Sequence, residues 1–347
     1  MAQVIIGGVE GGATNSHAMI MDSTGKILGK SRGQGTNHHL AGMTECRKRI
    51  ADLINAAKQE AGLPLDKPIT AVGLSLSGCE LEETNQELVN GIIKDYPNLA
   101  EKYVVASDTE GSISATSNKG GVVCIAGTGS NTLLIDTDGR KVQCGGWGNL
   151  LGDEGSAWKI AHSAVKYCFD DLDGFEKAPY PIDKVWDLVK CHFKIRKQPD
   201  ILEYFYMNFD KAFIASLTKE LSELAKSGDE LAAELFRQAG AYLAKSLSAV
   251  VAKASCELLR REGGIHITCV GSVWLSWELL MPGFVEELNR KQIIDELTLI
   301  RLKTEMGTGA VYLASDLLGL PLERDYTKNY TTLYNYKKES GMCNGSC

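Results

Sequence analysis

The 347-residue sequence lacks several features that assign chains to common protein classes. No apolar run approaches the roughly 18 residues of a transmembrane helix. Its 10 cysteines form no C-x-x-C pair, which argues against a zinc ribbon and against a disulfide framework. The 37 Lys and Arg residues are outnumbered by 44 Asp and Glu residues, so the chain has no basic excess of the kind that nucleic-acid binding requires. We therefore expect neither a membrane nor a nucleic acid among its partners.

The first residues also lack the basic segment of a secretory signal, because MAQVIIGGVE runs straight into a glycine-rich turn. We therefore expect a cytoplasmic protein. A chain of this length usually exceeds a single core, which predicts two domains. We expect an N-terminal domain over residues 1–117 and a larger C-terminal domain over residues 118–347. The second domain carries helical insertions, and its C-terminal segment can pack back on the first domain.

One pattern occurs twice along the chain. VIIGGVEGGATNS, from Val4, is an apolar strand that enters a glycine turn, and a second strand, the turn DSTGK and a third strand follow it. GVVCIAGTGSN, from Gly121, repeats this order with DTDGR at the corresponding turn. Asp and Gly are favoured in such hairpin turns. Strand–glycine–strand patterns are common, but the shared order of three strands and two turns favours a duplicated domain.

Apolar periodicity predicts an α/β chain around these repeats. We expect strands over residues 69–78, at the segment ending at Asp108, and over residues 266–274. We expect helices over residues 43–61, 82–94, 153–171, 277–288 and 307–318, and several more across residues 183–261.

Three glycine turns follow predicted strands, at residues 10–14, 126–131 and 270–274. Backbone N–H groups and the hydroxyls of Thr14, Thr128 and Ser130 could hold phosphates there. None of these turns is a Walker loop or a complete dinucleotide fingerprint, and each alone could be an ordinary hairpin turn. Glu10 is unexpected in such a turn, because its carboxylate would repel a phosphate.

Taken in order, GGVEGGAT, SDTEGSI, IAGTGSN, CGGWGNLLGDEGSAW and CVGSVW resemble the actin / sugar kinase / Hsp70 ATPase superfamily, and within it the eukaryotic-type N-acetylglucosamine kinases. The resemblance covers about residues 4–318. It implies two duplicated ribonuclease H-like domains with a nucleotide cleft between them, the actin-like ATPase fold. It also implies a homodimer that transfers phosphate from ATP to N-acetyl-D-glucosamine in amino-sugar metabolism.

In this superfamily an acidic residue of the first turn holds Mg²⁺, often through water. The resemblance assigns that role to Glu10, although a glutamate is one methylene longer than the usual aspartate. A cation there would turn the repulsion of phosphate into attraction. An exposed turn glutamate without a ligand is the alternative.

The resemblance further implies a set of ATP-binding residues. Those in the turns are Gly12, Thr14, Thr128, Gly129, Ser130, Gly271 and Ser272, and Ala215 would border adenosine. Spacing alone would leave Ala215 as an ordinary residue of a helix core.

Asp108 is the candidate catalytic base and a substrate contact, because it follows a strand end, where α/β folds collect ligands. An N-cap for the next helix is the alternative role. The resemblance adds Asn37 as a sugar contact, whereas His38 and His39 are expected to face solvent. Ser75–Gly78 can line the same pocket.

In the glycine-rich segment 144–156, Gly146 and Gly148 allow close approach of a sugar, and Trp147 offers an apolar face. Asp153 and Glu154 can accept hydrogen bonds from hydroxyl groups, and the resemblance favours Asp153 as a sugar contact while leaving Glu154 open. Asp153 and Glu154 also begin a helix, where negative charge is favourable without any ligand.

Three other functions fit parts of the pattern. One is a kinase for another hexosamine, such as N-acetylmannosamine, or for a hexose. Another is an iron–sulfur ATPase that activates a dehydratase, for which Cys124 and Cys144 are the cysteines near the cleft. The third is a repressor on the same fold, which would need a helix-turn-helix before the first strand, and we expect none here. Zinc is not expected, because Cys144 alone lies near the GDEGS segment.

Overall fold

The computed structural model describes residues 4–303 and 307–338, which divide into two compact units. The first unit holds the described residues of Met1–Val123, Thr137–Gly139 and Ile300–Thr332. The second holds those of Cys124–Asp136, Arg140–Leu299 and Leu333–Cys347. The single domain boundary predicted from the sequence lies after residue 117.

The first unit is built on a five-stranded sheet in the order β3-β2-β1-β4-β5. Strands β1 (Ile5–Gly11), β2 (Asn15–Asp22) and β3 (Ile27–Gln34) form an antiparallel meander. Strands β4 (Ala71–Leu76) and β5 (Tyr103–Ser107) run parallel to β1. The carboxyl ends of β1, β4 and β5 therefore meet at one edge of the sheet.

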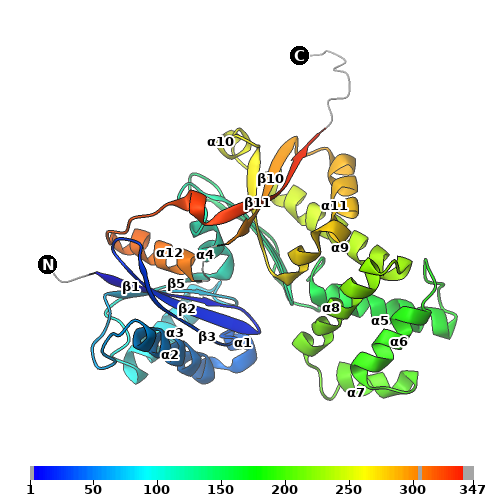
Figure 1. Cartoon of the computed structure of the whole chain (residues 1–347), viewed down its shortest axis with the longest axis horizontal. Coiled ribbons are helices and arrows are strands. Elements are labelled where there is room, and N and C mark those ends of the chain that lie inside the picture. Colours follow the sequence, from blue (N-terminus) through cyan, green and yellow to red (C-terminus); the bar gives the residue numbers. More distant parts are fainter. Residues whose placement is uncertain (1–3, 304–306, 339–347) are drawn as a thin grey trace, which may run out of the picture. The chain divides into compact units, whose positions relative to one another are not determined.

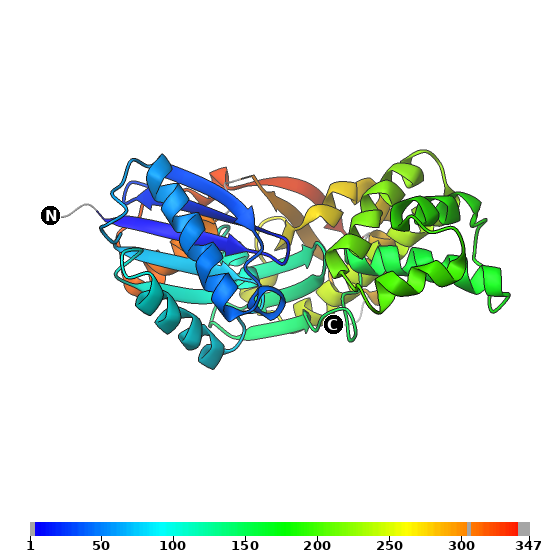
Figure 2. The ribbon, with the colours of Figure 1, turned by 90° about the horizontal axis from the view of Figure 1, so that it is seen from below.

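Helices cover both faces of this sheet (Figures 1 and 2). Side chains alternate between the faces of a strand, so Ile5 and Val9 of β1 join the core under α2 (Met43–Glu60) and α3 (Glu82–Asp95). Ile6 points to the other face and joins the core under α12 (Thr308–Leu318). The short helices α1 (His38–Ala41) and α4 (Asp108–Ser114) follow β3 and β5.

Two glycines let α12 lie close to the sheet. A Cβ atom at Gly73 would lie 2.0 Å from the carbonyl oxygen of Ala310, and one at Gly8 would lie 2.4 Å from that of Gly307. The backbone of α12 therefore occupies the space that side chains would otherwise fill.

The second sheet has the order β11-β10-β9-β6-β7-β8. Its first five strands along the chain are β6 (Gly121–Ala126), β7 (Ser130–Ile135), β8 (Lys141–Gly145), β9 (Ile265–Val270) and β10 (Glu296–Leu302). They lie in the order third, second, first, fourth, fifth, as in the first sheet, and β11 (Tyr330–Lys337) is an additional edge strand. The shared order confirms the duplicated architecture.

Most helices of the second unit lie between β8 and β9 in sequence. They are α5 (Ala157–Asp173), α6 (Asp183–Phe193), α7 (Leu202–Phe205), α8 (Lys211–Lys226), α9 (Glu230–Val251) and α10 (Cys256–Leu259), and α11 (Trp277–Lys291) follows β9. Short 3-10 helices cover Gln198–Ile201, Ser272–Ser276 and Tyr326–Lys328.

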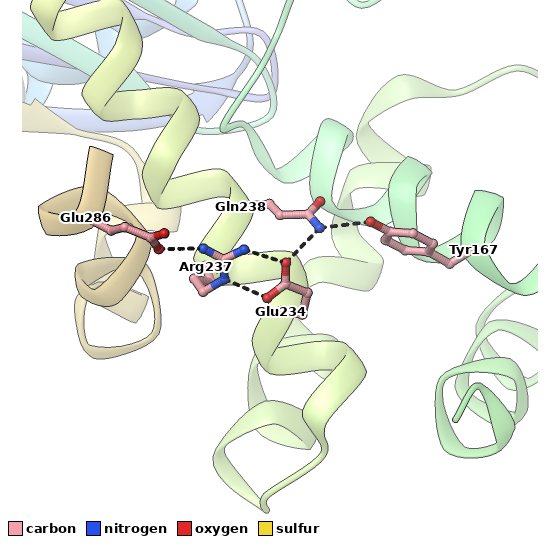
Figure 3. A network of polar contacts seen from close by, with 5 residues as sticks. All are labelled: Tyr167, Glu234, Arg237, Gln238 and Glu286. Carbon is pink, nitrogen blue, oxygen red and sulfur yellow. Dashed lines mark hydrogen bonds and ion pairs between the residues drawn. The ribbon is translucent and has the colours of Figure 1, made fainter. Parts of the chain in front are cut away.

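Helices α9 and α11 cross at two glycines. A Cβ atom at Gly240 would lie 2.0 Å from the carbonyl oxygen of Leu280, and one at Gly283 would lie 1.9 Å from that of Arg237. Arg237 adds polar contacts at this crossing, because it pairs with Glu234 of its own helix and with Glu286 of α11 (Figure 3).

The structure confirms the expected helices over residues 43–61, 82–94, 277–288 and 307–318 to within a few residues. The helix expected from residue 153 begins instead at Ala157, because Ser156 is its N-cap and its side chain accepts from the amide of Lys159. Two strands that the sequence analysis did not name, β10 and β11, complete the second sheet. Among residues 4–303 and 307–338, no helix combines the length and hydropathy needed to span a membrane.

Candidate functional site

The predicted catalytic side chains of the first unit gather at the carboxyl edge of its sheet. Gly11 of β1 pairs in register with Leu76 of β4, and Leu76 pairs with Ser107 of β5. Glu10, the Ser77–Gly78 turn and Asp108 therefore lie on neighbouring strand ends. The amide of Ser77 donates to the carbonyl oxygen of Gly11 at 2.7 Å and ties two of these ends together.

Asp108 is the first residue of α4, and the N-cap is its neighbour Ser107, whose hydroxyl accepts from the amide of Glu110. The N-cap role considered for Asp108 thus belongs to Ser107. Burial, together with the nearby charges of Glu80 and Glu10, raises the pKa of Asp108 to about 7. The amides of Asp108 and Thr109 oppose this shift by bonding the carboxylate. A carboxyl that titrates near neutrality has the pKa expected of a general base.

Glu10 has two roles open to it in this structure. Its Oε2 accepts from the amide of Gly307, the N-cap of α12, at 3.2 Å. Burial raises the pKa of Glu10, and the Gly307 bond partly offsets the effect. The bond to Gly307 engages Oε2 of this carboxylate. One carboxylate beside bound phosphates fits Mg²⁺, which commonly keeps several waters.

The described residues contain no group of three or more His, Cys, Asp or Glu side chains arranged to hold a metal ion by themselves. A magnesium ion at Glu10 would therefore need water and phosphate oxygens to complete its coordination.

Both polar atoms of the Asn37 side-chain amide form hydrogen bonds within the protein. Its oxygen caps α1 by accepting from the amide of His39 at 2.9 Å, and its nitrogen donates to the hydroxyl of Ser77 at 3.1 Å. These bonds fix the amide beside the Ser77–Gly78 turn. His39 is exposed as expected, but the expectation for His38 was wrong, because His38, the first residue of α1, is buried.

The first glycine turn is closed by its own backbone. The amide of Gly12 donates to the carbonyl oxygen of Asn15 at 2.9 Å, and the amide of Gly35 donates to that of Thr14 at 2.8 Å. Thr14 is exposed. The turn thus presents Thr14 to solvent on a backbone that β3 holds in place.

The second glycine turn is bonded on several sides. The amide of Gly127 donates to the carbonyl oxygen of Gly129 within the turn. The carbonyl oxygens of Gly127 and Thr128 accept from the amides of Ala157 and Trp158, at the start of α5. The amide of Ser130 donates to Asp153 Oδ1 at 3.0 Å, and its hydroxyl donates to the carbonyl oxygen of Glu154. Several donors that could have bound an anion are therefore used within the protein.

The second and third glycine turns lie against each other. Gly271 has φ +105°, and a Cβ atom there would lie 2.3 Å from the carbonyl oxygen of Ala126. Gly271 and Ser272 are both exposed. Ala215 is buried in α8, and the same helix bonds α5 through Thr218 and the segment after Gly271 through Ser222. The predicted nucleotide residues of this unit are thus joined by one helix.

The segment around Gly146 joins this arrangement through its backbone. The amide of Gly146 donates to the carbonyl oxygen of Ser130 at 3.1 Å, and Gly148, like Gly146, has a positive φ. The Trp147 side chain is 68% exposed, so its ring is open to a ligand. Asp153 is only 3% exposed, and its carboxylate is bonded within the protein.

Sequence reasoning missed Lys211 and Glu80. The ammonium of Lys211 lies 2.6 Å from Asp153 Oδ2, and the charge of Glu80 acts on Asp108. No local signal pairs Lys211 with Asp153, because 58 positions separate them in the sequence. Glu80 lies two positions after the SLSG segment and could have been included with it.

The two cysteines considered for an iron–sulfur cluster differ in environment. Cys124 is fully buried in β6 and accepts a hydrogen bond from Thr132, whereas Cys144 is half-buried in β8. Burial also raises the pKa of the Cys124 thiol to about 12. Cys124 is therefore poorly suited to ligate a shared cluster as a thiolate.

Two curated proteins resemble this chain over most of its length. An N-acetylmuramic acid/N-acetylglucosamine kinase from Clostridium acetobutylicum is 25% identical over 309 residues, which cover 88% of this chain and 97% of that protein. An N-acetyl-D-glucosamine kinase from Dictyostelium discoideum is 25% identical over 263 residues, which cover 73% and 81%.

Solved structures share the fold. One from Chromobacterium violaceum, assigned as an N-acetylglucosamine kinase, superposes with a TM-score of 0.69 at 23% identity and covers 89% of this chain and 98% of its own. A glucokinase from Streptomyces griseus with glucose and AMPPNP gives 0.57 at 14% identity, covering 91% and 99%. These likenesses confirm the two-domain, actin-like ATPase fold.

The model of the BadF/BadG/BcrA/BcrD ATPase family matches residues 8–298, a span that includes all of the glycine turns and Asp108. The chain therefore belongs to the BadF/BadG/BcrA/BcrD ATPase family.

Proposed function

We propose that this protein is an ATP-dependent sugar kinase that converts N-acetyl-D-glucosamine into N-acetyl-D-glucosamine 6-phosphate. The observation that carries the proposal is Asp108, which stands at the carboxyl end of β5 with its pKa raised to about 7. Such a carboxylate is half-ionised near neutral pH and can accept a proton from an alcohol.

In the proposed reaction Asp108 takes the proton of the sugar's 6-hydroxyl while the oxygen of that hydroxyl attacks the γ-phosphorus of ATP. The bond from that phosphorus to the bridging oxygen breaks, and ADP leaves with the electron pair. Phosphoryl transfer asks mainly for alignment and charge stabilisation, together with a base for the hydroxyl proton. Asn37 and Trp147 would orient the sugar, and the turns at residues 11–14 and 127–130 would hold the phosphates.

Glu10 would hold Mg²⁺, directly or through water. Magnesium, when bound, supplies positive charge that draws the phosphates toward the first turn and balances the charge of the transferring group. The Gly307 amide fixes the Glu10 carboxylate in place whether or not the ion is present.

The choice of sugar is supported by the two curated relatives, which share N-acetylglucosamine in their names. The relative from Clostridium acetobutylicum is also named for N-acetylmuramic acid, so this sugar is the second candidate acceptor. N-acetylmannosamine and glucose are the further alternatives that the sequence motifs left open.

We include in the proposal a cytoplasmic homodimer with two functional domains, near residues 1–117 and 118–347. Light scattering of the purified chain would check the dimer, because the 37.6 kDa protomer predicts a particle of twice that mass.

A coupled ADP-release assay tests the proposed function. The panel contains N-acetylglucosamine, N-acetylmuramic acid, N-acetylmannosamine and glucose, and a reaction without sugar measures background ATP hydrolysis. The proposal expects the highest kcat/KM with N-acetylglucosamine and a 6-phosphate product by NMR. Release of ADP that no sugar increases would contradict the kinase assignment.

A further inference from the structure

The Gly127–Ser130 turn lacks some of the donors that a phosphate would use. Ser130 gives its amide to Asp153 and its hydroxyl to the Glu154 carbonyl oxygen. The first amides of α5, at Ala157 and Trp158, point to carbonyl oxygens of the turn itself. A helix start of this kind often supplies the positive end for an anion, but these amides are already bonded. Positive charge for a phosphate must therefore come from another group.

Lys211 places an ammonium at this turn. Its Nζ pairs with Asp153 Oδ2 at 2.6 Å, and it would lie 3.1 Å from a Cβ atom built on Gly129. Asp153 Oδ1 also holds the Ser130 amide, so one buried carboxylate fixes both the turn and the ammonium. The Lys211 side chain is 22% exposed, against 3% for that of Asp153. Lys211 is thus the more exposed partner of the pair.

Both partners of this ion pair are unfavourable at their positions in the chain, Lys211 because of its charge and Asp153 because of its backbone conformation. Lys211 is the first residue of α8, where a cation opposes the helix dipole. Asp153 has φ +69°, a left-handed conformation that non-glycine residues adopt at a cost in energy. Departures of this kind concentrate at functional positions, because the rest of the fold must compensate for them.

We propose that Lys211 is a phosphate-binding residue for the nucleotide and that Asp153 is its positioning residue. This inference rests on the proposed function, because it takes the nucleotide to be ATP. An ammonium has three donors, so Lys211 can keep its ion pair with Asp153 while it donates to a phosphate oxygen. Asp153 thereby acts through Lys211 and the Ser130 amide.

Nucleotide binding without sugar tests this assignment. Calorimetry would compare ADP with adenosine, because a lysine that contacts phosphate affects ADP alone. We expect Lys211→Met to weaken ADP binding about tenfold or more and to change adenosine binding less than twofold. Lys226→Met is the matched control, since Lys226 ends the same helix in an exposed pair with Glu223 and should bind ADP normally.

A second variant separates phosphate binding from charge balance. Lys211→Met leaves Asp153 as a buried carboxylate without its cation, which can weaken the fold. The double variant Lys211→Met/Asp153→Asn carries no unpaired charge, and Asn retains an oxygen for the Ser130 amide. We expect the double variant to unfold near the wild-type temperature and to keep the ADP defect.

Three results would overturn the assignment. They are wild-type ADP affinity in Lys211→Met, recovery of ADP affinity in the double variant, and equal weakening of ADP and adenosine in both. A wild-type protein that binds ADP no better than adenosine would refute it as well. If the wild type binds ADP through Lys211 but phosphorylates no sugar of the panel, the proposed function fails and the role of Lys211 stands.

Discussion

Asp108 is the one side chain proposed to act as the base, and a substitution tests this role directly. We expect Asp108→Asn to lower kcat by about 10²- to 10⁴-fold, because that is the usual contribution of a general base. Sugar binding should remain measurable by calorimetry, since an amide still bonds a hydroxyl group. Glu110→Gln is the control, because Glu110 lies in the same turn of α4 and has no proposed role. Near-normal turnover of Asp108→Asn would remove Asp108 from the role of base.

The raised pKa of Asp108 predicts the pH dependence of activity. The carboxylate forms as pH rises through about 7, so kcat/KM should climb up to that pH and then level. Glu80 contributes to the shift through its negative charge. Glu80→Gln should therefore move the acid limb of the pH profile to lower pH, whereas Glu82→Gln, at the exposed start of α3, should leave it in place. An acid limb that stays put in Glu80→Gln would mean that another group titrates.

The raised pKa of Asp108 also predicts that the ionised carboxylate destabilises the folded protein. A carboxyl whose folded pKa lies above its ordinary value makes the folded state bind protons more tightly than the unfolded chain does. Stability due to Asp108 therefore falls as pH rises from about 4 to about 7. Thermal unfolding at pH 8 should show Asp108→Asn to be more stable than the wild type, and the difference should vanish near pH 4. A variant less stable than the wild type at pH 8 would contradict the burial argument.

Several site residues could be predicted from sequence because their roles are local. Glu10 lies at the end of β1, Asp108 and Gly271 directly follow β5 and β9, and the motif order identified them together. Asp153 was identified, but its partner Lys211 was not, because an ion pair between a loop and a distant helix leaves no pattern in either segment. The bond from Glu10 to Gly307 was missed for the same reason, since 297 positions separate the two residues.

At the scale of elements, apolar periodicity located the long helices well and failed for two strands. Strand β11 reads as a polar segment, because only Tyr336 of its eight residues is fully buried. Strand β10 follows α11 directly and lacks the glycine turn that marked the other strands. The glycines that bring α9 and α11 together also carry no sequence signal, because their reason is the neighbouring helix.

The neighbours of two helix glycines, Gly283 at the α9–α11 crossing and Gly91 in α3, predict opposite effects of Gly→Ala changes. Alanine gains about 1 kcal/mol over glycine in a helix, but a Cβ at Gly283 would lie 1.9 Å from the Arg237 carbonyl oxygen, and overpacking costs about 1–3 kcal/mol. We expect Gly283→Ala to lower the free energy of unfolding. Gly91 of α3 faces the flexible side chain of Arg47, so Gly91→Ala should be neutral or stabilising. Urea unfolding measures both, and a stable Gly283→Ala would contradict the crossing.

At the scale of the whole molecule, the two ligands should protect different segments. Hydrogen exchange with mass detection can follow these segments separately. We expect N-acetylglucosamine to slow exchange around residues 37–39 and 107–111 of the first unit and around Trp147 of the second. ADP should slow it around residues 127–131 and 211–216 of the second unit and around residues 11–14 of the first. Absence of protection at the segments assigned to both ligands would contradict these roles, and the α9–α11 crossing supplies an internal reference that should not change.

The first unit is assembled from segments that the ribosome synthesises early and late. Its sheet is complete at Ser107, but α12, which covers one face, begins at Thr308. Some 200 residues must leave the ribosome between these two events. During that interval Ile6 and Met19 have no covering helix, so the nascent chain carries an open hydrophobic face that chaperones would have to shield.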